Sequence, residues 1–216
     1  MEQAEAVLTD ALRRAERSLS APVVANPTVQ ARIEYIARLN SNRAGIRVIM
    51  ACALAKILHP EVDIRKPYTE IGTPDAYSGR TYDQNYIGQF ARAHRLPVNP
   101  TTAWLTPALR NISAPLAAPM VIAGTPRKMY EELILLLDDA YTGKSTSEDM
   151  LAECIRLLLL LRNERDTRIK QLLGELATSN TEMPLSSEEI VDLVRRHMES
   201  PNASSLPVLV VAAAYI

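Results

Sequence analysis

Cationic, amide and phenolic side chains gather between residues 59 and 95, and their chemistry suits contact with a nucleic acid. Lysine and arginine can bind phosphate, and arginine can also bind the O6 and N7 atoms of guanine. Glutamine and asparagine can pair with adenine, while tyrosines can donate to phosphate or stack on bases. The candidate DNA-binding residues are Arg65, Lys66, Tyr68, Thr69, Arg80, Tyr82, Gln84 and Asn85.

An ordinary loop is the alternative interpretation of this segment. Residues 59–80 show no helical periodicity and are interrupted by prolines and glycines. Loops of this length in compact domains are usually functional or disordered. Half of the chain's 8 tyrosines lie between Tyr68 and Tyr86, which argues against disorder. Those tyrosines could simply hold the loop against neighbouring helices, so both interpretations stay open.

The charge of the chain is distributed unevenly. Its 24 basic and 25 acidic residues give a formal net charge of −1, which excludes a general polycation. Residues 30–110, however, hold eleven Lys and Arg against six acids, a local charge of about +5. This surplus favours an anionic partner for that part of the chain, although a plain helical surface produces the same asymmetry.

Catalytic motifs are incomplete throughout the sequence. Residues 143–145 resemble the end of a phosphate-binding loop, but Asp138 stands where its first glycine is required. No acid is followed two positions later by lysine, the pattern of common Mg²⁺-dependent nucleases. The cysteines, Cys52 and Cys154, lie in separate apolar runs without zinc spacing, and the histidines stand near no nucleophile motif. We therefore expect neither catalytic residues nor a metal site in this chain.

The elements that must position the candidate residues are helices. Ala, Leu and Arg are abundant, Gly is scarce, and apolar residues recur at helical spacing, so the predicted fold class is all-α with one long functional loop at 59–80. We expect Asn42 to cap the third helix, and Ser186 or Ser187 with Glu189 to open the last one. Helices are predicted over residues 2–19, 27–39, 42–58, 81–95, 101–109, 127–141, 148–176 and 187–198.

The predicted domain organisation has four parts. Residues 1–112 form a helical DNA-engagement domain, and a Pro/Ala connector follows at 113–126. A helical subdomain occupies 127–200, and the apolar residues 201–216 are the truncated start of a downstream domain. The first residues lack the pattern of a signal peptide and no stretch suits a membrane span, so we expect a cytoplasmic protein.

Two strings of residues carry a resemblance to a known family. Residues 63–72 (DIRKPYTEIG) and 77–83 (YSGRTYD) resemble the N-terminal part of the SacI-like family of type II restriction endonucleases. Asn26-Pro27, the helix start at 42–44 and residues 96–104 (LPVNPTTAW) look similar to the same family. The likeness covers residues 26–112 well and the remainder loosely.

The resemblance implies a site-specific enzyme that cuts double-stranded DNA with Mg²⁺ in a restriction-modification system. It places the nuclease residues downstream, since residues 206–215 look like the lead-in to the family's catalytic domain. This chain is then expected to bind DNA or contribute to target recognition, to need no cofactor and to be inactive alone. The alternative is a structural module whose Leu-rich helices between Met129 and Met198 form a homodimer or pack on the nuclease domain without contacting DNA.

Overall fold

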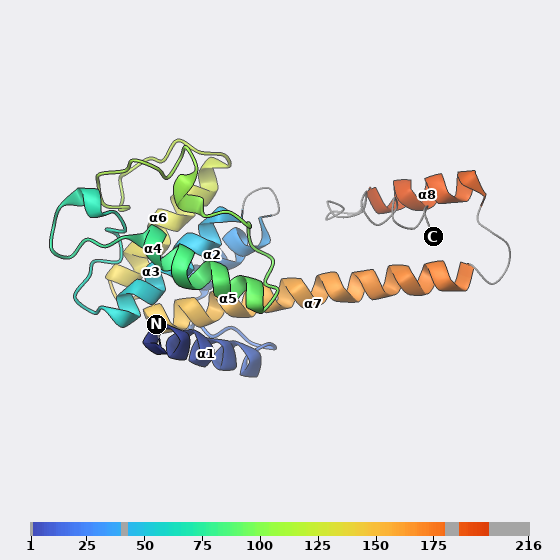
Figure 1. Cartoon of the computed structure of the whole chain (residues 1–216), viewed down its shortest axis with the longest axis horizontal. Coiled ribbons are helices and arrows are strands. Elements are labelled where there is room, and N and C mark those ends of the chain that lie inside the picture. Colours follow the sequence, from blue (N-terminus) through green and yellow to red (C-terminus); the bar gives the residue numbers. More distant parts are fainter. Residues whose placement is uncertain (1, 40–42, 180–185, 199–216) are drawn as a thin grey trace. The chain divides into compact units, whose positions relative to one another are not determined.

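The computed structural model describes residues 2–39, 43–179 and 186–198, and it confirms the all-α fold class (Figure 1). Within these residues the elements are helices, and no strand occurs. In chain order they are α1 (Glu2–Arg17), α2 (Pro27–Arg38), α3 (Ala44–Leu58), the 3₁₀ turn η1 (Thr69–Ile71), α4 (Gly79–Tyr82), the π turn η2 (Asp83–Ile87), α5 (Gly88–Ala93), the 3₁₀ turn η3 (Ala103–Leu105), α6 (Arg127–Tyr141), α7 (Ser147–Ser179) and α8 (Ser187–Met198).

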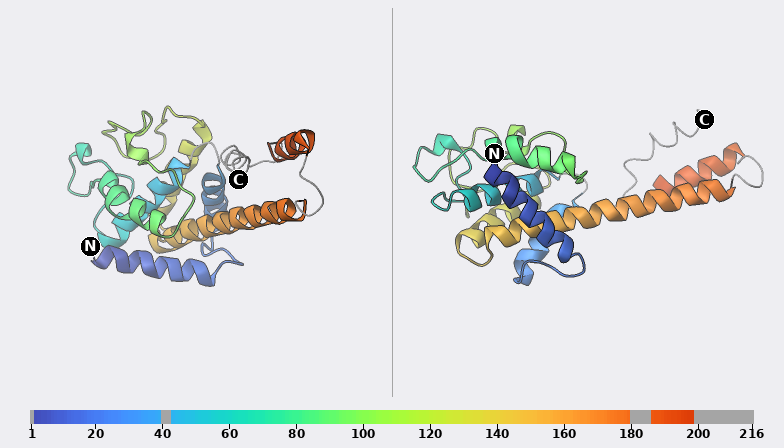
Figure 2. Two further views of the ribbon diagram at one scale, coloured as in Figure 1. Left: turned by 45° about the vertical axis from the view of Figure 1, so that its right-hand side comes forward. Right: turned by 60° about the horizontal axis from the view of Figure 1, so that its bottom comes forward.

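Helix α3 forms the centre of the first compact unit, which spans residues 1–164. Its sequence is apolar on every side, as expected of a helix enclosed by others, and all residues from Ala44 to Ala55 are buried. Helices α1, α2, α4 and α6 and the turns η2 and η3 contact it, and Figure 2 shows this arrangement from two further directions. The first turns of α7, between Met150 and Leu159, also contribute buried residues to this core.

The start of α7 is fixed in this unit by a buried ion pair. Glu153 and Arg156 are both buried, and Arg156 Nη2 lies 2.5 Å from Glu153 Oε1. The other carboxylate oxygen of Glu153 accepts a hydrogen bond of 2.7 Å from the backbone N–H of Val23. The pair therefore joins α7 to the segment that follows α1.

The loop at residues 59–80 is held by its own backbone. Hydrogen bonds run from the N–H of Asp63 to the carbonyl of Asp75 (2.9 Å), and from the N–H of Tyr77 to the carbonyl of Lys66 (3.1 Å). A third runs from Gly79 to Pro67 (3.0 Å). The two arms of the loop thus lie side by side, which satisfies backbone groups that a long connection would otherwise leave without partners.

Two predicted helices differ from the observed elements. The helix expected at 81–95 is a continuous run from Gly79 to Ala93 that contains a π turn. The helix expected at 101–109 is only the 3₁₀ turn at 103–105, because Thr106 is extended (φ −68°, ψ 150°), as the residue before a proline prefers to be. The predicted cap Asn42 lies outside the described residues.

The segment 113–126 lies inside the first unit. The backbone N–H of Leu116 donates to the carbonyl of Arg65 (2.7 Å), and α6, which follows the segment, packs on α2 and α3. The boundary between compact units falls within α7, after Glu164, and not at this Pro/Ala segment.

The second unit spans residues 165–216 and is described for the end of α7 and for α8. Helix α8 opens with the predicted capping box. The N–H of Ser186 donates to the Glu189 carboxylate (2.8 Å), and the N–H of Glu189 donates to the Ser186 hydroxyl (3.3 Å). The predicted downstream start at 201–216 lies outside the described residues. Within the described ranges, every helix is too short or too polar to cross a lipid bilayer.

Candidate nucleic-acid interface

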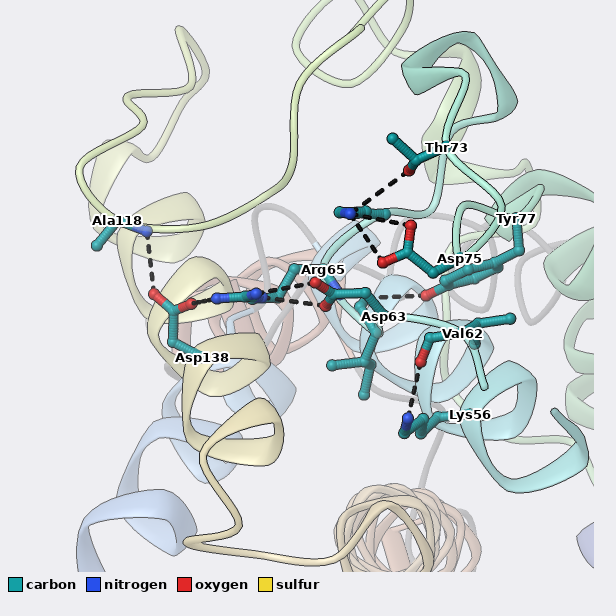
Figure 3. Close-up of polar contacts among 11 residues, drawn as sticks. Lys56, Val62, Asp63, Arg65, Thr73, Asp75, Tyr77, Ala118 and Asp138 are labelled. Atoms are coloured by element: carbon teal, nitrogen blue, oxygen red, sulfur yellow. Dashed lines mark hydrogen bonds and ion pairs between the residues drawn. The ribbon is translucent and has the colours of Figure 1, made fainter. Parts of the chain in front are cut away.

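Arg65 makes its contacts inside the protein (Figure 3). Its Nε and Nη2 atoms donate to the two carboxylate oxygens of Asp63 at 3.0 and 2.8 Å, and Nη1 lies 3.4 Å from Asp138 Oδ1. Its guanidinium carbon also stands 3.3 Å from the centroid of the Tyr141 ring. The two carboxylates neutralise Arg65, which joins the loop at 59–80 to α6.

Lys66 and Tyr68 are also occupied by internal partners. The Lys66 ammonium lies 2.9 and 2.8 Å from the two carboxylate oxygens of Asp75. Tyr68 is buried, its hydroxyl donates to the carbonyl of Leu109 (2.8 Å), and its ring meets Trp104 edge-on at 5.4 Å. These contacts favour the alternative interpretation for this half of the segment, which is a loop held against the helices by its side chains.

Asp63 makes the stability of this loop sensitive to acid. Burial alone would raise the pKa of Asp63, but hydrogen bonds from the side chain and backbone of Arg65 outweigh it and hold that pKa below its ordinary value. Because its pKa is lowered in the folded state, ionised Asp63 stabilises the folded protein. This stabilisation is fully present above the ordinary pKa of about 3.9, and it is lost as the pH falls through the folded-state pKa. We expect urea unfolding between pH 6 and pH 2.5 to show this loss in the wild type and a smaller loss in Asp63→Asn; equal pH dependence would contradict it.

The two cysteines, which lie in apolar runs of the sequence, are buried. Burial raises the pKa of the Cys52 thiol to about 12, although a hydrogen bond with Tyr77 opposes the shift. Burial likewise raises the pKa of Cys154, with the charge of Glu153 acting in the same direction. Both thiols therefore stay protonated at neutral pH and make poor nucleophiles.

Arg80, Gln84 and Asn85 lie exposed on the continuous helix from Gly79 to Ala93. Residues four apart share one face of an α-helix, and Arg80 Nε donates to Gln84 Oε1 at 3.2 Å. Thr69 is also exposed, but it lies in η1, where its hydroxyl contacts Glu70 (3.3 Å). Three of the eight predicted residues are thus brought together on one accessible helix.

Tyr82 lies at the edge of this helix and is only partly exposed. Its ring is 6.0 Å from those of Tyr77 and Tyr86 and 6.4 Å from that of His59. Burial is the main reason why its pKa is raised. Tyr82 therefore anchors the helix on the loop at 59–80, although its partial exposure leaves part of the side chain accessible.

The π turn places two further polar residues on the same face. A π turn contains one residue more than an α turn, and here the N–H of Gly88 bonds to the carbonyl of Asp83, five residues earlier. In a regular helix, the fourth and seventh residues after Gln84 would share its face. With one additional residue in the turn, these positions are taken by Gln89 and Arg92. Both are exposed. We call Arg80, Gln84, Asn85, Gln89 and Arg92 the Arg-amide face.

A buried ion pair supports the π turn from below. Arg47 of α3 and Asp83 are both buried, and Arg47 Nε lies 2.8 Å from Asp83 Oδ1. The second oxygen of Asp83 accepts from the Thr102 hydroxyl. Gly88 leaves room for this arrangement, since a Cβ at that position would stand 2.9 Å from Arg47 Nη2. The position of the Arg-amide face is thus fixed by contacts with the core.

The Arg-amide face carries positive charge without a competing acid. Asp83 is the only acid among residues 79–93, all of which the structure describes, and it is buried and paired with Arg47. Apart from the bond between Arg80 and Gln84, the side chains of these five residues have no hydrogen-bond partner within the described ranges. Their donors and acceptors are therefore available to a ligand.

Sequence reasoning missed Gln89, Arg92 and the supporting Arg47. The spacing of polar residues along the helix is the signal that could have found Gln89 and Arg92. The extra residue of the π turn hides it, because it shifts these two residues by one position from the spacing of a regular helix. In the described parts of the chain, no three His, Cys, Asp or Glu side chains converge in a way that would hold a metal ion.

Comparison of the chain with protein-family models, with curated proteins and with solved structures finds no match.

Proposed function

We propose that this chain is the N-terminal helical part of a type II restriction endonuclease and that it engages double-stranded DNA through the Arg-amide face. The resemblance of residues 63–72 and 77–83 to the SacI-like family suggests the parent enzyme. The observation that carries the DNA contact is a helix face with two arginines and three amides and without an exposed acid. Cleavage itself is assigned to a domain outside this chain.

The physical properties of the face suit a DNA groove. The major groove is wide enough to admit an α-helix, and arginine and amide side chains are the groups that read base edges there. Phosphate contacts by arginine position a protein on the duplex without reading its sequence. Arg92 lies at the far end of the face from Arg80. It is suited to phosphate contact because no side-chain hydrogen bond within the described residues orients it.

Salt-dependent binding tests this proposal. We expect the chain to bind short DNA duplexes, with Arg80→Ala combined with Arg92→Ala reducing the affinity at low salt by about tenfold or more. Each lost phosphate contact should also make the slope of log K against log salt shallower by about 0.9. Fluorescence anisotropy with a labelled random-sequence duplex across a salt series measures both quantities.

A matched double variant controls for lost charge. Arg13 and Arg17 are exposed on α1 and have no ion-pair partner within the described residues, so their replacement by alanine removes the same charge from another helix. This control should bind DNA nearly as the wild type does. Equal affinities for all three proteins, or no binding at low salt, would contradict the proposal.

A module for assembly is the second candidate, and the second unit favours it. Leu173 of α7 and Val191 of α8 are 57% and 53% exposed, and such apolar side chains can contribute to an interface. Such residues could bind a second copy of the chain or the nuclease domain. Light scattering tests the first of these partners, since a monomeric chain would exclude the homodimer and leave only packing on the nuclease domain.

A further inference from the structure

We infer that Arg80 and Gln84 act as one unit that reads guanine in the major groove, an inference that rests on the proposed DNA contact. The two residues stand four apart on exposed helix, and Arg80 Nε donates to Gln84 Oε1 at 3.2 Å. This bond engages the only acceptor atom of the Gln84 side chain. We call the two residues the donor pair.

The donor pair presents N–H groups to a ligand. Arg80 keeps the N–H groups of its two terminal nitrogens, and Gln84 keeps its amide NH₂ group. Guanine offers two acceptors in the major groove, N7 and O6, whereas adenine offers the acceptor N7 beside the donor N6. A set of donors can therefore pair with both acceptors of guanine. On adenine, one of these donors would face the N6 donor, and the unpaired N–H group would cost binding energy. The pair should therefore select guanine over adenine.

Gln84 by itself would suit a different base. A free glutamine pairs with adenine by using its oxygen and its NH₂ group together. One lone pair of the Gln84 oxygen is engaged by Arg80, so the adenine mode must use the remaining lone pair and is disfavoured while the bond persists. The side chain of Asn85, next to it, has no partner within the described residues and keeps both groups, so it retains the chemistry that suits adenine.

The surroundings of the donor pair keep it oriented. The bond to Gln84 restricts the guanidinium, which lowers the entropy cost of a two-point contact. The helix beneath is fixed by the buried pair of Arg47 and Asp83. With Asp83 neutralised there, no acid on residues 79–93 competes with a base for the arginine.

Selection from a duplex pool tests this inference with the full chain. Short duplexes with a randomised core are incubated with the protein, and the bound fraction is sequenced. We expect guanine at one position to be enriched by about tenfold, within the discrimination of a good bidentate contact. Arg80→Ala should abolish the enrichment while Arg92 retains residual binding to all sequences.

Gln84→Glu is the matched variant because it is nearly isosteric with the wild type. Glutamate can still accept from Arg80, but it has no N–H group to donate and its charge neutralises the arginine. Guanine enrichment should therefore fall to near the level of the input pool. Both side chains are exposed, so thermal unfolding should confirm that neither variant loses its fold.

Modified bases locate the contact within guanine. Replacing the selected guanine by 7-deazaguanine removes N7 and should lower the affinity of the wild type by about tenfold but that of Arg80→Ala very little. Duplex binding without guanine enrichment would overturn the donor pair and leave the proposed function standing. Enrichment of adenine that disappears in Gln84→Ala would also overturn it. Absence of any duplex binding at low salt would overturn both proposals.

Discussion

Replacing Asp83 by alanine is expected to lower the free energy of unfolding by about 3–5 kcal/mol, because it leaves a buried guanidinium without its counter-charge. The side chains of Arg47 and Asp83 are 4% and 0% exposed. Arg47 Nη1 would keep the carbonyls of Asn99 (2.6 Å) and Thr101 (3.1 Å), but neutral acceptors do not balance its charge. The Thr102 hydroxyl would lose its acceptor as well.

Urea unfolding at neutral pH measures this loss, and two further variants define its cause. Glu131→Ala breaks an exposed ion pair with Arg127 (2.7 Å) and should cost less than about 1 kcal/mol. Arg47→Met combined with Asp83→Leu removes both charges together and should recover much of the stability lost in Asp83→Ala. A loss below 1 kcal/mol in Asp83→Ala would show that the pair is not buried as described.

The helices could be predicted from the sequence because their signals are local. The predicted bounds of α6 and α8 match the structure, and α2 ends one residue before its predicted end. Capping residues, prolines and the apolar repeat all act within a turn or two of the residues they affect. The Ser186–Glu189 capping box is an example of a signal contained in four residues.

The π turn could not be predicted in the same way. It depends on Arg47, which is 36 residues before Asp83 in the sequence, and on a glycine whose missing Cβ makes room for that arginine. Periodicity over residues 81–95 indicates a helix but does not reveal one additional residue. Because of this residue, Gln89 and Arg92 join the face of Arg80 and Gln84.

The candidate site could be predicted only in part, because residue type does not show whether a side chain has an internal partner. Arg65 and Arg80 have the same chemistry, and the sequence offers both as phosphate or guanine ligands. Asp63 stands near Arg65 in the sequence, but Asp138 is 73 positions away and reaches it only through the packing of α6. The structure distinguishes the two arginines by their partners, because Arg65 is paired with carboxylates and Arg80 contacts only the Gln84 side chain within the described residues.

This separation leads to opposite expectations for Arg65→Met and Arg80→Met. Arg65→Met leaves Asp63 and Asp138 without their shared cation, and the side chain of Asp63 is only 7% exposed. It also removes the contact with the Tyr141 ring. Since the group is partly exposed, we expect a loss of about 2–3 kcal/mol in unfolding free energy. DNA affinity per folded molecule should change little.

Arg80→Met should show the reverse pattern, because its only partner within the described residues is the uncharged Gln84 side chain. Its unfolding free energy should stay within about 0.5 kcal/mol of the wild type, as for other exposed substitutions, while affinity for a guanine-containing duplex falls by about tenfold. Urea unfolding and anisotropy on the same preparations measure both quantities. If Arg65→Met is stable but binds DNA weakly, the ion pairs of Arg65 must open when DNA binds, and the loop at 59–80 would then belong to the interface.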